Sequence, residues 1–425
     1  MEQTVMNPAA VREARSRIDS VRRQNVEFTV LRDGRPVPNV RLSVRMVNHD
    51  FLFGAVCYMY GKYADPAMNE TFSREFTNLF NYTMVPFHWN WYEPRRGEFA
   101  EPYTGNLLSW AERCGLKKKL HALIWHECCP DWVHESDDIE ALYTERISQM
   151  MLHYGDRFDF FDVANETTVN DRFENPVSHW VRRTGPMHML KFGTKLTRSF
   201  RPDAKLIYGD WNVHGEEYTR FLQEMRDNDI DIDLLGMQSH MHSERWTAEE
   251  TLRVIDNAAA FGWPIHFPET SICSGTPVGE MQFSAGAVNR FAETEADLYS
   301  QADYAADFYT LVFSHPAVEA LSWFDFTDHR WLGAPGGCVT DDLRRKPVYD
   351  ALYRLIHQEW HSDLAGSTDA RGALRGRLFF GTYEITAEEE GKAPRRFVRE
   401  LRRPSFFTDD GSLRRVGLNL DEENV

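Results

Sequence analysis

The sequence predicts an α/β fold, a (β/α)8 TIM barrel with a small β-sandwich-like accessory domain. From residue 51 onward, short apolar runs alternate with longer amphipathic stretches, which is the pattern of strands followed by helices. Eight such units occupy about 300 residues, a length that suits one barrel. A doubly wound sheet would instead need a glycine-rich phosphate loop after its first strand, and the sequence has none there.

The expected barrel elements follow one another along the chain. The strands are short runs rich in apolar and aromatic residues, at 51–57, 82–87, 119–125, 159–165, 205–210, 234–239, 264–269 and 319–325. The helices carry apolar residues at helical spacing, at 68–80, 105–113, 139–154, 187–200, 216–226, 248–261 and 298–312. A last amphipathic helix at 349–356 closes the barrel.

Smaller units are expected at the two ends of the chain. Asn7 and Pro8 are a typical N-cap and first-turn proline, so residues 1–24 are expected to form a helix. Alternating runs at 26–30 and 40–47 predict a β-hairpin, and a strand at 378–386 has an expected partner at 397–401. Neither end is long enough to fold easily alone. We expect residues 25–50 and 361–425 to form one discontinuous accessory domain beside a catalytic barrel at 51–360.

The C-terminal ends of the expected strands collect side chains suited to chemistry. Functional groups of (β/α)8 barrels lie at this end. In chain order the ends supply Trp125, His126, Asn165, Glu166, Gln238, His240, Glu269 and Trp323. A purely structural rim would not need this mixture of histidine, amide, tryptophan and carboxylate side chains.

Two carboxylates stand out, because Glu166 and Glu269 each end a short apolar strand. A pair of facing carboxylates can cleave a glycosidic bond, one as acid/base and the other as nucleophile. Either residue alone could equally be a charge at a loop edge or half of a salt bridge. Their shared place at the mouth of one barrel favours the catalytic interpretation.

Several motifs together resemble glycoside hydrolase family 10, the family of endo-β-1,4-xylanases and their relatives. The motifs are DVANE at 162–166, PETSI at 268–272, HALIWH at 121–126 followed by PDWV at 130–133, GMQSH at 236–240, and tryptophans at 323 and 331. Each motif is modest alone, but their order and spacing agree with the family. The resemblance covers roughly residues 51–356 and implies a (β/α)8 barrel that hydrolyses β-glycosides with retention of configuration.

The resemblance also implies roles for individual residues. Glu269 would be the nucleophile and Glu166 the acid/base, while Asn165 would bind the sugar 2-hydroxyl and His240 would orient Glu269. A satisfied rim histidine is the structural alternative for His240. The remaining expected substrate-binding residues are His88, His121, Trp125, His126, Gln238, Trp323 and Trp331. His121 and His126 are expected to form hydrogen bonds rather than to hold a metal, and no metal or cofactor is expected.

One segment departs from the family pattern. After the second strand the family usually has a Glu-Asn pair and a Lys that hold the sugar on the glycone side. Here the run VPFHWNWYEP at 85–94 places His88 and aromatic residues instead. We therefore expect this sugar to be recognised differently. The alternatives to a xylanase are a hydrolase of another β-linked or decorated glycan, and a non-catalytic carbohydrate-binding barrel.

Composition limits the kinds of binding partner and the cellular location that the sequence allows. The 425 residues carry a net charge of −17, which argues against nucleic-acid binding. The six cysteines fit neither a zinc site nor a disulfide framework. Residues 1–24 lack the apolar segment of a signal peptide, and no stretch is long enough for a membrane span. The expected partner is a polysaccharide or oligosaccharide. A cytoplasmic location is expected if Met1 is the native start, and a secreted or periplasmic one if a signal peptide was removed.

Overall fold

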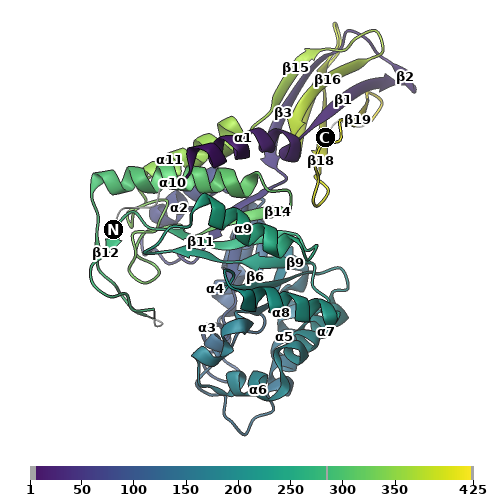
Figure 1. The fold of residues 1–425 in the computed structure, drawn as a ribbon. Helices are drawn as coiled ribbons and strands as arrows, with labels where there is room; N and C mark the ends of the chain where they lie inside the picture. Colours follow the sequence, from purple (N-terminus) through teal and green to yellow (C-terminus); the bar gives the residue numbers. More distant parts are fainter. Residues whose placement is uncertain (1–5, 284–285, 423–425) are drawn as a thin grey trace.

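The computed structural model describes residues 6–283 and 286–422, and its centre is a closed ring of eight parallel strands (Figure 1). The strands are β4 (Leu52–Val56), β5 (Tyr82–Pro86), β6 (Lys117–His121), β7 (Phe160–Asn165), β8 (Lys205–Asp210), β9 (Leu234–Met237), β11 (Ile265–Ile272) and β14 (Val318–Asp325). Each pairs in parallel with the next, and β14 pairs back with β4. The predicted barrel is confirmed.

Helices follow the strands and cover the ring. They are α2 (Pro66–Leu79), α4 (Glu101–Arg113), α5 (Ile139–Tyr154), α7 (Pro186–Phe200), α8 (Glu216–Asp227), α9 (Ala248–Ala259), α10 (Glu295–Phe313) and α11 (Pro347–Arg354). Polar side chains cap four of them at their N-termini: Asp65, Asp138, Thr247 and Thr294. All residues of β5, β9 and β11 are buried, as expected of parallel strands covered on both faces.

Local structure that the sequence did not predict lies in the loops after the second and fourth strands. Here α3 (Trp89–Tyr92), a 3-10 segment (Thr167–Arg172) and α6 (Pro176–Thr184) are added to the barrel. Asn175 caps α6 by accepting a hydrogen bond from the Ser178 amide. A short strand, β10 (Ser239–Met241), continues the sixth strand beyond Gln238 and pairs with β11.

The N-terminal helix α1 (Pro8–Arg22) lies against the barrel helix α10. Asn7 caps it, as expected, by accepting a hydrogen bond from the Ala9 amide. At its other end the buried Arg22 side chain donates to the carbonyl oxygens of Phe313, His315 and Val318. The helix is therefore fastened to the barrel where the accessory strands begin.

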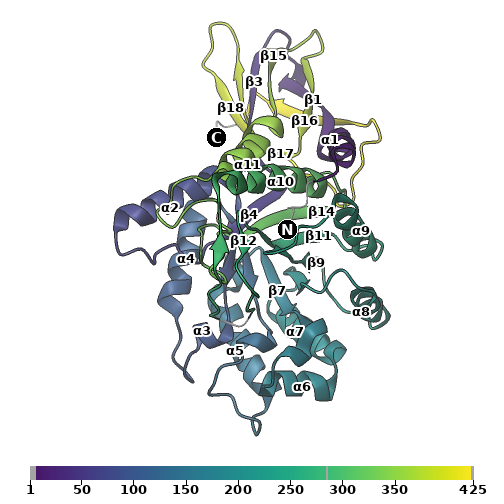
Figure 2. The ribbon, with the colours of Figure 1, turned by 60° about the vertical axis from the view of Figure 1, so that its left-hand side comes forward.

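The two ends of the chain form two sheets beside the barrel (Figure 2). One contains β16 (Ala373–Phe379), β1 (Arg23–Arg32), β19 (Leu413–Asn419) and the short β2 (Arg35–Pro36). The other contains β15 (Asp363–Ser367), β3 (Arg41–His49), β17 (Gly381–Glu388) and β18 (Arg395–Leu401). Each sheet combines strands from both ends, which fits the accessory domain that the sequence predicts.

The predicted hairpin between 26–30 and 40–47 is wrong. β1 pairs with β16 and β19, whereas β3 pairs with β15 and β17 in the other sheet. Both strands bury alternate apolar residues, including Phe28 in β1 and Val44 in β3. The chain crosses from one sheet to the other between β1 and β3, and the long partners of each strand come from the C-terminal part of the chain. The sequence around β1 and β3 does not contain this information. The expected partnership of the later runs is confirmed, because β17 and β18 are antiparallel neighbours.

Within the described ranges, no helix is both long and apolar enough to span a membrane. All six cysteines are free thiols.

Candidate active site

Glu166 stands directly after β7, where the strand gives way to a loop. Its backbone is left-handed (φ 56°), which is uncommon for a residue other than glycine, and its amide donates to the Gly209 carbonyl over 2.8 Å. The side chain is buried, and its Oε1 accepts hydrogen bonds from Asn165 (3.1 Å) and Gln238 (2.9 Å). Backbone and side-chain bonds together fix this carboxyl group.

Glu269 lies within β11, three strand positions along the ring from β7 by way of β8 and β9. Two histidines flank its buried carboxylate. His240 Nε2 lies 3.2 Å from Oε2, and His121 Nε2 lies 3.6 Å from Oε1. His240 in turn contacts the Ser271 hydroxyl through Nδ1 at 2.9 Å. The nucleophile candidate is thus flanked by one histidine from the adjoining β10 and by another from the end of β6, farther round the ring.

The two carboxyl groups are in different electrostatic environments. Burial, and then the charges of Glu269 and Glu127, raise the pKa of Glu166 well above its ordinary value. Burial alone would also raise the pKa of Glu269, but the hydrogen bond with His240 and the interactions with His121 and Lys119 outweigh it and lower this pKa. The environment of Glu166 thus favours the protonated form and that of Glu269 the ionised form, which is the division that an acid and a nucleophile need.

A buried polar chain continues from Glu269 into the barrel. His121 Nδ1 lies 2.6 Å from Asp162 Oδ2, and the same carboxylate oxygen accepts a short hydrogen bond from Lys119 Nζ. Lys119 and Asp162 are almost completely buried, at 0% and 1% exposure. Burial raises the pKa of Asp162, but Lys119 and His121 outweigh it, so the net pKa is lowered.

Aromatic residues form a wall beside these carboxylates. The His88 ring lies 5.1 Å from Trp125, 5.6 Å from His121 and 4.6 Å from Trp91. Trp91 is 56% exposed. Three expected residues, His88, His121 and Trp125, are thus together, on the side where the sequence departs from the family pattern.

A second group of rings forms around Trp331. Its ring lies 4.3 Å from His240, 4.4 Å from His242 and 5.0 Å from Phe324. Because His240 contacts Glu269, Trp331 belongs to the surroundings of the carboxylates. His242 and Phe324 were not predicted. His242 follows His240 at the spacing of one strand face, a signal that was available.

Trp323 is not brought together with this group, contrary to the expectation. It has 0% exposure, packs against Tyr309 of α10, and donates from Nε1 to the Gly336 carbonyl over 2.6 Å. Successive side chains of a strand point to opposite faces, so Trp323 points to the helix layer and Phe324 toward Trp331. The expectation for Trp323 came from the resemblance to the family, which does not fix the direction of this side chain.

His126 is also directed elsewhere. Its ring packs against Phe173 at 5.4 Å, and burial lowers its pKa to about 4. The residue after it, Glu127, interacts electrostatically with both Glu166 and Glu269, and burial raises its pKa. Glu127 was not among the predicted residues, although it stands inside the third-strand motif.

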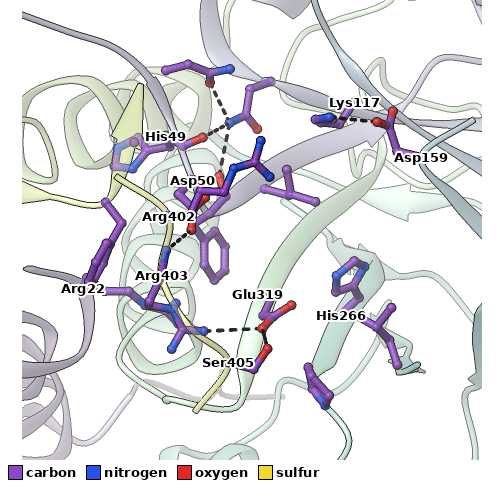
Figure 3. Close-up of a pocket in the computed structure, with 18 of the residues that line it drawn as sticks. Arg22, His49, Asp50, Lys117, Asp159, His266, Glu319, Arg402, Arg403 and Ser405 are labelled. Atoms are coloured by element: carbon purple, nitrogen blue, oxygen red, sulfur yellow. Dashed lines mark hydrogen bonds and ion pairs between the residues drawn. The ribbon is translucent and has the colours of Figure 1, made fainter. Parts of the chain in front are cut away.

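A cavity of about 820 Å³ lies at the opposite end of the barrel (Figure 3). It is bounded by the starts of the barrel strands and by residues of the accessory sheets, and neither candidate carboxylate lines it. Its charged residues pair with one another: Lys117 with Asp159 at 2.8 Å, and Arg403 with Glu319 at 3.9 Å (Figure 3). It is a junction between barrel and accessory strands. Among the described residues, no group of three or more His, Cys, Asp or Glu could hold a metal ion.

A closed parallel barrel with two carboxyl groups of opposite protonation preference at its strand ends has the architecture of a barrel-type glycoside hydrolase. The chain matches the model for glycosyl hydrolase family 10 over residues 45–354. This match covers more than half of the chain, and the protein belongs to glycosyl hydrolase family 10.

Curated proteins and solved structures are also similar to this chain. The anti-sigma-I factor RsgI6 of Acetivibrio thermocellus is 23% identical over 406 residues, which are 92% of this chain and 48% of that protein. The chain thus spans about half the length of this relative. Endo-1,4-beta-xylanase B of Thermotoga neapolitana is 23% identical over 64% of this chain and 78% of its own length. The crystal structure of xylanase 10B from Thermotoga petrophila with xylobiose shares the fold, with a TM-score of 0.60, 18% identity, and coverage of 73% of this chain and 95% of that one.

Proposed function

We propose that the protein is a retaining β-glycoside hydrolase of xylanase type, which cleaves β-1,4-xylosidic bonds in xylan or xylo-oligosaccharides. Glu166 acts as the acid/base and Glu269 as the nucleophile. The observation that carries the proposal is the opposite displacement of their two pKa values. The xylanases among the relatives favour a xylan-type substrate.

The reaction proceeds in two displacements. Ionised Glu269 attacks the anomeric carbon while protonated Glu166 gives its proton to the leaving glycosidic oxygen, which forms a glycosyl ester on Glu269. Glu166, now ionised, takes a proton from water, and the resulting hydroxide attacks the anomeric carbon and releases Glu269. This chemistry requires the two carboxyl groups to be about 5–5.5 Å apart. Asn165, which donates to Glu166, is proposed to bind the sugar 2-hydroxyl.

The test is hydrolysis of an aryl β-xyloside and of xylo-oligosaccharides by the wild type, Glu269→Ala and Glu166→Ala. Both variants are expected to lose activity on oligosaccharides by at least about a thousandfold. Azide should restore Glu166→Ala on the aryl substrate and give a β-glycosyl azide, because azide attacks the anomeric carbon, releases Glu269 and, unlike water, needs no base to remove a proton. Glu244→Ala, an exposed carboxylate after His242, is the matched control and should stay active. Binding without turnover by the wild type would instead support the carbohydrate-binding alternative.

A hydrolase of another β-linked or decorated glycan is the second candidate, and the aromatic wall favours it. His88 and Trp91 stand in the run where the family pattern has a Glu-Asn pair and a Lys, and Trp125 packs against His88. Flat rings stack on sugars without needing the same hydroxyl pattern. A panel of β-glycans with product sizing decides between the candidates, since the xylanase proposal requires xylan or xylo-oligosaccharides to be the best substrates.

We also propose the division into an N-terminal helix (1–24), an accessory domain (25–50 plus 361–425) and a catalytic barrel (51–360). The sheet pairings between N- and C-terminal strands support it. The proposed partner is a polysaccharide or oligosaccharide.

A further inference from the structure

A charged pair lies inside the barrel directly below the candidate nucleophile. Barrel interiors are usually filled with branched apolar side chains, yet Lys119 and Asp162 occupy this one and are buried. Removing two charges from water costs several kcal/mol, which an ion pair repays only in part. Such a pair is weak evidence for stability and stronger evidence for a role in the adjacent site.

The contacts of the pair lead in one direction. Asp162 Oδ2 accepts a hydrogen bond from Lys119 Nζ on one side and lies 2.6 Å from His121 Nδ1 on the other. Because an ionised carboxylate only accepts, the His121 nitrogen that faces it carries a hydrogen. This contact fixes the ring and directs Nε2 toward Glu269 Oε1, 3.6 Å away.

The support on the other side of Glu269 is different. His240 reaches Oε2, and behind it stands the neutral Ser271 hydroxyl at 2.9 Å. Glu269 is therefore held between one imidazole backed by a carboxylate and an ammonium group, and another backed by a hydroxyl group. The charged pair therefore supports Glu269 on the His121 side, inside the barrel.

We infer that Lys119 is a positioning residue for Glu269 and acts through Asp162 and His121. Lys119 holds Asp162 as a fixed acceptor, Asp162 fixes the His121 ring, and His121 keeps Glu269 in place. The ammonium charge also favours the ionised carboxylate as attacking group in the first displacement and as leaving group in the second. The inference rests on the proposed role of Glu269.

Other charged and titratable groups also act on these residues. Glu269 faces His240, His121 and Lys119, and interacts with Glu166, Glu127 and Tyr58. Asp162 faces Lys119 and His121 and interacts with Tyr82, while Lys119 also interacts with His266. Among these, Lys119 is the amino group that is buried inside the barrel. Its removal therefore takes away one of the groups that lower the pKa of Glu269.

The experiment compares two substitutions with opposite effects on charge. Lys119→Met removes the positive charge and Asp162→Asn removes the negative charge at nearly constant shape. The ionisation of Glu269 is followed by NMR of ¹³C-labelled glutamate carboxyl groups, assigned with Glu269→Gln, and by the acid limb of kcat/KM. Lys117→Met, on the same strand and in a surface ion pair with Asp159, is the matched control.

Lys119→Met is expected to move the Glu269 midpoint and the acid limb up by about one pH unit. Asp162→Asn should move the midpoint down, Lys119→Arg should stay near the wild type, and Lys117→Met should change nothing. An unchanged midpoint in Lys119→Met, or shifts of the same sign in both variants, would overturn the inference. If Lys119→Met does not fold, a downward shift in Asp162→Asn supports it and an unchanged midpoint overturns it.

The NMR midpoint needs no turnover, so it separates this inference from the proposed function. A wild type that shows the shifts but hydrolyses no glycoside would refute the function and leave the charge coupling intact. A wild type that hydrolyses glycosides, together with an unchanged Glu269 midpoint in Lys119→Met, would support the proposed function and refute the role of Lys119.

Discussion

Gln238 donates a hydrogen bond to Glu166 over 2.9 Å, from a segment that also holds Glu269. Two residues further along, His240 lies 3.2 Å from Glu269. Side chains two apart on an extended chain point the same way and start about 6.5–7 Å apart. The segment from Gln238 to His240 thus contacts both carboxyl groups. The short length of this segment limits the distance between the Glu166 and Glu269 carboxyl groups.

Gln238→Ala should damage the second displacement more than the first. The Gln238 amide stabilises ionised Glu166, and its hydrogen bond lowers the pKa that burial raises. A hydrogen bond to a charged group contributes about 1.5–3 kcal/mol, so we expect kcat to fall about tenfold to a hundredfold. The basic limb of kcat/KM should move to higher pH. Gln223→Ala, on the barrel helix α8, is the control, and an unchanged pH profile for Gln238→Ala would contradict the assignment of Glu166 as acid/base.

Glu166→Gln should stabilise the protein at high pH only. Burial, Glu269 and Glu127 raise the pKa of Glu166, so its folded-state contribution is complete below the unfolded pKa and is lost as pH rises through the folded pKa. Glutamine keeps the neutral shape at every pH. We therefore expect a melting temperature a few degrees above wild type at alkaline pH and no gain near pH 4. Thermal scans at both pH values check this, and an equal gain at both would show that charge is not the cause.

Glu127→Gln tests a residue that the sequence did not single out. Its charge is one cause of the raised pKa of Glu166, after burial and Glu269. Removing this charge should move the basic limb of kcat/KM to lower pH and change kcat at the optimum less than tenfold. The pH profile on an aryl β-xyloside measures the shift. If the basic limb does not move, the charge of Glu127 does not act on Glu166. The control is Glu244→Ala, an exposed carboxylate whose removal should leave the pH profile unchanged.

The two tryptophans of the eighth strand region allow the same substitution to be compared in two environments. Trp331→Ala should weaken substrate binding and raise KM, with little loss of stability, because this ring packs against His240 and His242 beside the carboxylates. Trp323→Ala should cost about 3–5 kcal/mol of folding free energy, because it empties a buried site next to Tyr309. Urea denaturation and KM are measured for both variants. A raised KM with little loss of stability in Trp323→Ala would show that Trp323 contacts the substrate after all.

The barrel could be predicted because its signals are local. The run 205–210 is β8 and the pattern at 139–154 is α5, since strand and helix periodicity both act over a few residues. Pairing between distant strands has no such signal, which is why β1 and β3 were joined in a hairpin although they belong to different sheets. Apart from the short β2 beside β1, their partners lie more than 300 residues away.

The candidate site was predicted where motif and strand end coincide, as at Glu166 and Glu269. It was missed where side-chain direction decides, because Trp323 and Phe324 are neighbours in sequence and point to opposite faces. The charged pair below the site could not be predicted either. Nothing in the sequence distinguishes Lys119 from Lys117, yet one is inside the barrel and the other forms a surface pair with Asp159.

Arg22→Met should loosen the junction between barrel and accessory strands without affecting catalysis. The Arg22 guanidinium is buried, lies over the Phe51 ring at 4.6 Å, and donates to three barrel carbonyl groups. Methionine fills much of the space but leaves those carbonyl groups without their donor, at about 1 kcal/mol or more each. We expect unfolding at a clearly lower urea concentration, measured by tryptophan fluorescence. Arg12→Met, exposed on the same helix, should match the wild type. Because the carboxylates lie at the opposite end of the barrel, folded Arg22→Met should keep wild-type kcat, and a lost kcat with unchanged stability would show that the two ends are coupled.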